Sequence, residues 1–326
     1  MVAPVAPAAA EDEDGADYRE GPDAFELREA VVDAASHGQR LDKVLVALAP
    51  EFSRNHLQSL VERGHVRVDD QTATVPARKL RAGQRLQLEL VPTEESLAFR
   101  AQAMALDIVF EDQHLLVLNK PAGLVVHPAP GNWSGTLLNG LLAHHAAATG
   151  LPRAGIVHRL DKDTSGLMVV GKTLAAVTAL SRAIAAREVH RHYLALAHGR
   201  VAWADRSVDV PIGRDPVSRI RMAVVASGRP ARTDLHCVAC NAAFSALACK
   251  LHTGRTHQIR VHLAWLKHPL VADGLYGGAA ALGMQRQALH AQRLRLQHPH
   301  SAAWLDFECA APADFAQAWA QVIGRA

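Results

Sequence analysis

The stretch from Gly155 to Lys172, GIVHRLDKDTSGLMVVGK, is the part of the sequence that decides the fold. An apolar entry leads into a polar loop that contains Asp161 and Asp163, and Gly166 opens a second apolar run. This pattern predicts two strands whose connecting loop gathers charged side chains at one tip. The spacing alone favours a turn or capping role for both aspartates, with a chemical role for Asp161 as the alternative.

A second polar cluster lies in LHTGRTHQIRVHLAWLKHP, residues 251–269. Thr256 is placed to begin a helix whose apolar positions include Ile259 and Leu263, and Arg260 lies beside that apolar face. An arginine there either pairs with a buried carboxylate or extends its charged end to solvent, which is the usual case. Neither cluster decides a function by itself.

Residues 107–326 combine many short apolar segments with few helices, and several segments are separated by gaps of hairpin length. This favours an α+β domain with a mixed, mostly antiparallel sheet over a doubly wound parallel sheet. The predicted strands lie at residues 108–110, 115–118, 124–126, 167–170, 193–197, 208–210 and 244–251, and the predicted helices at 136–147, 174–187, 256–266 and 314–323.

The amino-terminal third divides into three predicted parts. Residues 1–36 are rich in Ala, Pro and acids, so we expect a disordered tail; the first 33 residues carry ten acids and two arginines, a net charge of −8. The apolar pattern of residues 37–92 predicts a compact module of two short helices followed by strands. We expect residues 93–106 to form a polar linker. The remaining chain after residue 33 then carries +11.

The module at 37–92 has a basic polar face. Clustered cations favour contact with phosphates, whereas an ordinary solvated surface would intersperse more acids. The candidate RNA-binding residues are Arg40, Lys43, Arg54, Arg63 and Lys79. Arginine supplies 28 of the 35 cations, which suits bidentate phosphate binding but also fits GC-rich codon usage.

Several classes of protein are excluded. No run of about 18 apolar residues occurs, so we expect no membrane span. The first residues lack the basic region of a signal peptide, which predicts a cytoplasmic protein. Cys237 and Cys240 form a single CxxC without a second pair, and the histidine clusters lack a suitably spaced carboxylate, so we expect no metal. Walker, GxGxxG, HExxH and GxSxG motifs are absent from the sequence.

Taken together, the motifs resemble the RluA family of pseudouridine synthases over residues 38–323, in the same order. The module around RLDKVL, SRNHLQSLVERGHVRVDD and KLRAG resembles the S4-like α-L RNA-binding domain, with Asp70 where that domain usually has Gly. Asp tolerates the left-handed backbone conformation that such a turn requires. The matching stretches are NKPAGLVVHP (119–128), GIVHRLDKDTSGLMVVGKT (155–173), RHYLALAHG (191–199), LHTGRTHQIRVHLA (251–264), DGLYGG (273–278) and QALHAQRLRLQHP (287–299).

The resemblance implies the pseudouridine synthase fold and the isomerisation of uridine to pseudouridine in RNA, without a cofactor. It implies that Asp161 is the catalytic aspartate, that Tyr193 stacks on the target base, and that Arg260 pairs with the catalytic carboxylate. Arg159 would fill the space left by an extruded nucleotide. The same motifs assign substrate binding to His158, Thr164, Arg255 and His257 as well.

Within the family, the motifs resemble the branch that modifies a stem-loop of 23S ribosomal RNA at the subunit bridge. The expected partner is therefore large-subunit rRNA or a pre-ribosomal particle, bound by a monomer. Three alternatives remain: a non-catalytic RNA-binding assembly factor, the same chemistry on other rRNA or tRNA uridines, and a hydrolase with an aspartate nucleophile. The set of Asp161, Tyr193 and Arg260 argues against the first, and the lack of a phosphate-holding or metal-holding motif argues against the last.

Overall fold

The computed structural model describes residues 26–91, 97–218 and 220–324, and the chain divides into two compact units, residues 1–93 and 94–326. The expected disordered tail at 1–36 falls largely on residues 1–25, which lie outside the described residues. For the end of this segment the prediction of disorder is wrong, because Glu26–Val31 forms a strand, β1, which pairs with β4 (Arg85–Leu90). The acidic side chains of β1 stay mostly exposed, so backbone pairing rather than an apolar pattern holds it.

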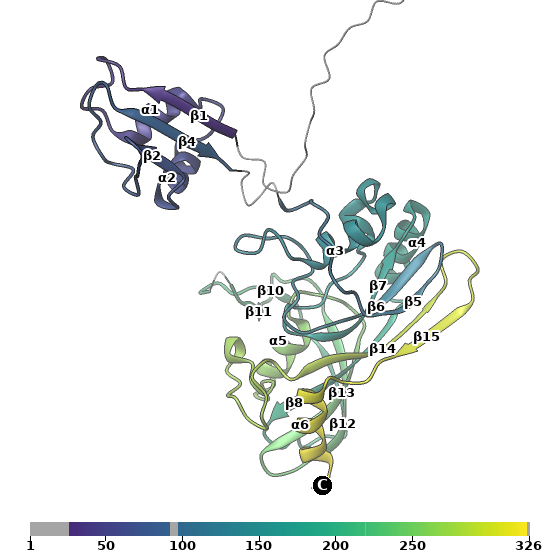
Figure 1. Cartoon of the computed structure of the whole chain (residues 1–326). Coiled ribbons are helices and arrows are strands. Elements are labelled where there is room, and N and C mark those ends of the chain that lie inside the picture. Colours follow the sequence, from purple (N-terminus) through teal and green to yellow (C-terminus); the bar gives the residue numbers. More distant parts are fainter. Residues whose placement is uncertain (1–25, 92–96, 219, 325–326) are drawn as a thin grey trace, which may run out of the picture. The chain divides into compact units, whose positions relative to one another are not determined.

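The first unit packs two helices on a four-stranded antiparallel sheet with the order β1-β4-β2-β3 (Figure 1). Leu41, Leu57 and Leu88 are fully buried in its own core. The turn between β2 and β3 uses Asp69 and Asp70 at φ of 52° and 61°, as the tolerance of Asp for this conformation predicts. The elements are α1 (Leu41–Leu48), α2 (Arg54–Glu62), β2 (Val66–Val68), β3 (Gln71–Thr72) and β4 (Arg85–Leu90).

The second unit is built on a nine-stranded sheet in which β14 runs parallel to β7 and the other pairs are antiparallel. The order is β5-β6-β7-β14-β8-β13-β12-β9, with β15 also paired to β14, and β10 and β11 form a separate ribbon. The predicted α+β class with a mixed, mostly antiparallel sheet is confirmed. The strands are β5 (Ile108–Glu111), β6 (Leu115–Lys120), β7 (Ser165–Gly171), β8 (His190–His198), β9 (Asp205–Asp209), β10 (Ile212–Arg214), β11 (Met222–Val224), β12 (Arg232–Cys240), β13 (Phe244–Leu251), β14 (Leu289–Gln297) and β15 (Trp304–Glu308).

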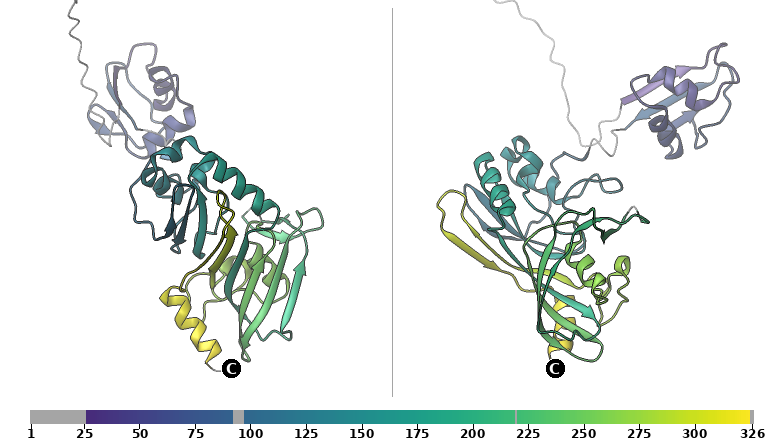
Figure 2. Two further views of the ribbon diagram at one scale, coloured as in Figure 1. Left: turned by 90° about the vertical axis from the view of Figure 1, so that its right-hand side faces the viewer. Right: turned by 180° about the vertical axis from the view of Figure 1, so that it is seen from behind.

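Helices cover both faces of this sheet. The helices are α3 (Leu137–His144), α4 (Leu174–Ala185), α5 (Gln258–Trp265) and α6 (Ala313–Ile323). Leu116 and Leu118 of β6 pack with α3 and α5, while Leu115 and Val117 face the side that α4 covers, as alternation along a strand requires. Figure 2 shows α4 and α6 near opposite ends of the sheet, with α6 packed on β12 and β13. The candidate site lies on the face of α3 and α5.

Three further sequence-based expectations need correction. The apolar stretch before the Asp161 loop forms no strand, because Ile156 makes only an isolated bridge to Val170 of β7. Residues 124–126 are not a strand: the carbonyls of Val125 and Val126 accept the N–H groups of Leu137 and Leu138 in the first turn of α3. They satisfy helix donors that have no partner within the helix. Of the expected linker at 93–106, residues 92–96 lie outside the described residues, and the following stretch packs on α3, where Asn139 Nδ2 donates to the carbonyls of Leu97 and Arg100.

Candidate active site

The loop that carries Asp161 is fixed from below by Lys120, the last residue of β6. Its Nζ donates to the carbonyls of Pro121 at 2.7 Å, Leu124 at 2.9 Å and Lys162 at 2.8 Å. All three ammonium donors are therefore used, and the side chain has no exposed surface. Burial lowers the pKa of Lys120 to about 8, against the attraction of nearby carboxylates. Because Lys162 follows Asp161, this lysine sets the position of the aspartate's backbone.

The other end of the loop is fixed by a close approach of two backbones at Gly166. Gly166 has φ +118°, and a Cβ there would lie 2.2 Å from the carbonyl oxygen of Ala291 on β14. The parallel pairing of β7 with β14 therefore requires glycine at this position. The TSG part of the opening motif is explained by this contact between strands.

Asp161 meets Arg260, which begins far away in the sequence on α5. Arg260 Nη1 donates to Asp161 Oδ2 at 3.0 Å, while Nε and Nη2 donate to the two oxygens of Asp273 at 2.8 and 2.9 Å. Asp273 thus holds the guanidinium in a bidentate pair and leaves one edge for Asp161. Burial opposes the charge of Arg260, but the two carboxylates outweigh it and raise the pKa of its guanidinium. Arg260 is therefore a buried partner of carboxylates and does not extend its charged end to solvent.

An aromatic and imidazole pair surrounds this ion pair. Tyr276 lies under Arg260, with the guanidinium carbon 5.0 Å from the ring centre, and its hydroxyl is 2.8 Å from His257 Nδ1. The other ring nitrogen of His257 is 3.9 Å from Asp161 Oδ1. Burial lowers the pKa of His257, although Asp161 opposes the shift. The neutral imidazole is therefore favoured at neutral pH.

Tyr193 lies on β8, and its side chain faces the side of the sheet that α3 and α5 cover. Its side chain is buried beside Ala195 and Leu251. Burial, reinforced by the charge of Asp161 and opposed by Arg191, raises the pKa of Tyr193 to about 12. Its hydroxyl is therefore protonated at neutral pH and is able to donate a hydrogen bond.

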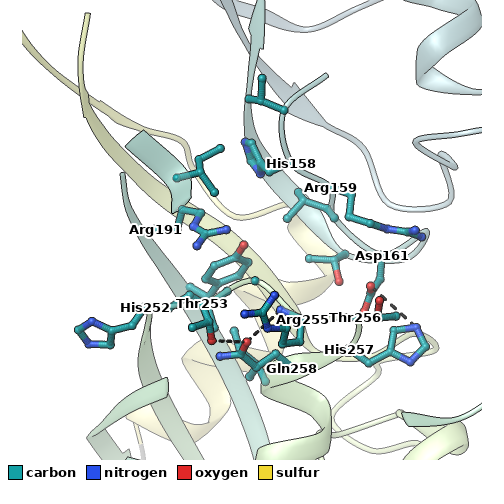
Figure 3. A pocket seen from close by; sticks show the side chains of 18 of the residues that line it. His158, Arg159, Asp161, Arg191, His252, Thr253, Arg255, Thr256, His257 and Gln258 are labelled. Atoms are coloured by element: carbon teal, nitrogen blue, oxygen red, sulfur yellow. Dashed lines mark hydrogen bonds and ion pairs between the residues drawn. The ribbon is translucent and has the colours of Figure 1, made fainter. Parts of the chain in front are cut away.

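Of these residues, Asp161, Tyr193, His257 and Arg260 line a cleft of about 390 Å³ (Figure 3). The lining holds one carboxylate, that of Asp161, together with the six arginines Arg153, Arg159, Arg187, Arg191, Arg255 and Arg260. Such a lining produces a positive potential that attracts a polyanion.

The residues predicted as a site come together here. Asp161, Tyr193 and Arg260 line the cleft, and so do all five predicted substrate-binding residues, Arg159, His158, Thr164, Arg255 and His257. Asp161 and Asp163 do lie in a turn, which is closed by backbone groups: the Thr164 N–H donates to the Asp161 carbonyl at 3.1 Å. The Asp161 carboxylate itself binds Arg260, so its side chain does not have the capping role that the spacing favoured. Lys120 and Asp273 were not predicted as site residues, although they lie in the quoted motifs NKPAGLVVHP and DGLYGG.

In the first unit the predicted cations have two different environments. Arg40 and Arg54 both bind the carboxylate of Asp42, which has no exposed surface, at 2.9 and 2.8 Å. Arg54 therefore also holds the start of α2 to α1, whereas Arg40 pairs within the first turn of α1. Lys43, Arg63 and Lys79 lie on the exposed surface.

Two further findings concern the described residues alone. Within residues 26–91, 97–218 and 220–324, no group of three or more His, Cys, Asp or Glu side chains is arranged to hold a metal ion. None of the helices in that part of the chain has the length and apolar character needed to cross a membrane.

The fold and the site define an RNA pseudouridine synthase, and the chain belongs to the RNA pseudouridylate synthase family, whose sequence profile matches residues 114–265. An S4 domain profile matches residues 39–86. The protein is thus an RNA-modifying isomerase, and the resemblance inferred from its motifs is confirmed.

Among individual proteins, the chain is similar to those named "Ribosomal large subunit pseudouridine synthase D". That of Nitrosomonas europaea is 48% identical over 287 residues, covering 86% of this chain and 83% of the relative. That of Neisseria meningitidis serogroup B is 49% identical over 290 residues, covering 85% and 77%. The solved structure of "Human RNA Pseudouridylate Synthase Domain Containing 1" has a TM-score of 0.52 and 28% identity, covering 64% of this chain and 84% of that one.

Proposed function

We propose that this protein converts specific uridines of large-subunit ribosomal RNA to pseudouridine, with Asp161 as the catalytic residue. The observation that carries the proposal is that Asp161 is the single carboxylate of a cationic cleft and is held by Arg260 at 3.0 Å. The names of the similar proteins support the choice of large-subunit RNA.

The reaction exchanges one glycosidic bond for another. The bond between the ribose anomeric carbon and N1 of uracil breaks, the base turns, and the anomeric carbon bonds to C5. C5 then gives up its proton and N1 gains one, so no electron donor or acceptor is needed. A carboxylate serves this reaction as a nucleophile toward the sugar or the base, or as a proton acceptor, and Asp161 would act by one of these routes.

The target nucleotide must leave its stack to reach Asp161, because that carboxylate lies inside the cleft with its side chain 15% exposed. Extrusion costs least in a loop, where bases are unpaired. Arg159, which is exposed on the rim of the cleft, would occupy the vacated space. Tyr193 would stack on the extruded base from the sheet side.

Arg260 holds the Asp161 carboxylate in position, and Asp273 keeps Arg260 in place. This division of tasks leaves Asp161 with one hydrogen bond from a guanidinium and the rest of its lone pairs open to the substrate. All three residues come from one chain, so we propose that a monomer carries out the reaction. Its RNA substrate places the reaction in the cytoplasm.

A competition experiment tests the substrate. A large-subunit rRNA stem-loop and a tRNA anticodon arm compete for the enzyme in two parallel mixtures, one with only the stem-loop tritiated at uridine C5 and the other with only the tRNA arm tritiated, and tritium release is followed in each. We expect the rRNA stem-loop to react faster, and preference for the tRNA arm would overturn the substrate while leaving the isomerase intact. Mapping of pseudouridines by carbodiimide treatment in RNA from cells lacking the protein then locates the uridines, and an unchanged map would favour a non-catalytic assembly factor.

A further inference from the structure

Arg191 is a buried arginine for which the structure offers no partner. Its side chain lies on β8 and the residue is 6% exposed. Among the described residues it makes no side-chain hydrogen bond or ion pair, and its Nε is a buried donor without an acceptor. A buried charge without a counter-ion is costly, so such a group is expected to find its partner in a ligand.

Arg191 lines the same cleft as Asp161 and Tyr193. Arg191 and Tyr193 are two residues apart on β8 and therefore project from the same face, about 7 Å apart along the strand. Figure 3 shows Arg191 on the opposite side of the cleft from Asp161, near Thr253. A ligand that spans the cleft would thus touch Asp161 at one end and Arg191 at the other.

The surroundings of Arg191 fix its guanidinium and leave its charge uncompensated. A Cβ on Gly254 would lie 2.8 Å from Arg191 Nη1, so the guanidinium packs directly on the backbone of that loop. Asp161 is the carboxylate of the lining, and Arg260 already binds it. His158 is neutral, because burial and the charge of Arg191 lower its pKa to about 3. Its Nε2 accepts the Val169 N–H at 3.0 Å, so the proton lies on Nδ1, which has no partner.

We propose that Arg191 binds a backbone phosphate of the RNA next to the nucleotide that enters the cleft. A phosphate supplies the negative charge and the two acceptor oxygens that match a guanidinium, whereas a base carbonyl would leave the buried charge uncompensated. The proposal rests on the proposed function for the identity of the polyanion. It adds a residue that recognises the substrate's backbone rather than its base.

The test combines a protein change with a change of one phosphate. Affinity is measured by fluorescence anisotropy for a uridine-containing rRNA stem-loop, either all-phosphate or with a single neutral methylphosphonate linkage on the 5′ or 3′ side of the target. Arg191→Gln should weaken binding of the all-phosphate RNA about 10- to 100-fold. One of the two neutral linkages should weaken the wild-type protein similarly and leave Arg191→Gln almost unaffected.

Two further variants keep the result interpretable. Arg182→Gln removes the same charge from the exposed surface of α4, outside the cleft, and should keep its full sensitivity to the neutral linkage. Gly254→Ala retains every charge but displaces the guanidinium, and should lose part of both the affinity and the sensitivity. Thermal unfolding of each variant shows whether the fold is retained.

Equal sensitivity of wild type and Arg191→Gln to both linkages, with both folded, would overturn the proposal. Tritium release by the wild-type protein on the same RNA is recorded alongside. If the wild type forms pseudouridine but the effect of a neutral linkage does not depend on Arg191, the inference on Arg191 fails and the proposed function stands. If no RNA yields pseudouridine while the coupling is present, the proposed function fails and the phosphate contact stands.

Discussion

At the scale of single residues, the site depends on how two carboxylates share one arginine. Asp273 takes two donors of Arg260 and Asp161 takes one. The geometry separates a structural carboxylate, with 1% of its side chain exposed, from one that is 15% exposed and faces the cleft. The two aspartates should therefore respond differently to the same substitution.

Asp161→Asn should abolish pseudouridine formation while leaving RNA affinity within about tenfold. The amide is neither a nucleophile nor a base at neutral pH, but phosphate contacts supply most of the binding. Single-turnover assays and anisotropy on the same RNA measure the two effects. Residual turnover above a few per cent would rule out Asp161 as the catalytic group.

Asp273→Asn should lower both activity and stability, because it breaks a buried pair and leaves Arg260 undercompensated. Loss of one partner of such a pair costs about 3–5 kcal/mol of unfolding free energy. We expect kcat to fall more than KM rises, since Asp273 acts through Arg260 and not on the substrate. Asp306→Asn, at a half-exposed pair with Arg293, is the matched control and should cost less than about 1 kcal/mol. An equal loss in both variants would contradict a special role for Asp273.

Sequence could identify the catalytic candidates only through their motifs. Asp161 and Arg260 are 99 residues apart, so no local spacing predicts their contact, and Asx-turn propensity pointed to a different role for the aspartate. Lys120 and Asp273 were missed for a related reason. Both residues position other groups. These roles follow from the three carbonyls around Lys120 and from the bidentate pair of Asp273 with Arg260, which only the structure shows.

At the scale of elements, Lys120 joins the end of β6 to the loop of Asp161, and its low pKa makes that connection measurable. Between about pH 8 and 10.5 the unfolded chain holds this proton more firmly than the folded protein, so wild-type stability rises with pH across that window. A shift of this size corresponds to about 3 kcal/mol. Below about pH 8 both states are protonated and this contribution to the slope disappears.

Lys120→Met should remove this slope. The stability of the wild type relative to the variant is expected to increase by about 3 kcal/mol from pH 8 to 10.5. Urea unfolding of both proteins at several pH values provides the measurement, with Lys79→Met at an exposed position as control. The variant should also turn over more slowly, because three carbonyls lose their donor and the loop is no longer fixed. If the unfolding free energies of wild type and variant change with pH in the same way, Lys120 is not desolvated in the folded protein.

Helices and strands could be predicted where their burial requires a regular pattern of apolar residues in the sequence. The apolar run of β7 is buried along its whole length, and its strand follows from that. β1 was missed because its pairing with β4 is made by backbone groups beneath an acidic surface. Residues 124–126 have strand-like side chains, but their carbonyls cap α3, which sequence patterns do not encode.

At the scale of the whole molecule, the chain has two units with separate cores. We propose that the first unit adds RNA affinity and that the second carries the chemistry. The described members of the proposed catalytic set all belong to residues 94–326. The exposed cations Lys43, Arg63 and Lys79 belong to the first unit, whose two other candidate arginines are bound to Asp42. The RNA-binding role of the first unit is a prediction from the sequence, based on the crowding of cations with few acids among residues 40–81.

Deletion of residues 1–93 should therefore weaken binding to a structured rRNA fragment and flatten its salt dependence, with turnover at saturating RNA retained. Each lost phosphate contact should reduce the slope of log affinity against log salt by about 0.7 to 0.9, so loss of three contacts reduces it by roughly 2 to 3. Deletion of residues 1–25 alone is the control: this acidic segment displaces no counter-ions from RNA, so the slope should stay as steep as in the full chain. An unchanged slope after the larger deletion would mean that the first unit does not contact RNA in the productive complex, and the arginines of the cleft would then have to supply the whole electrostatic attraction.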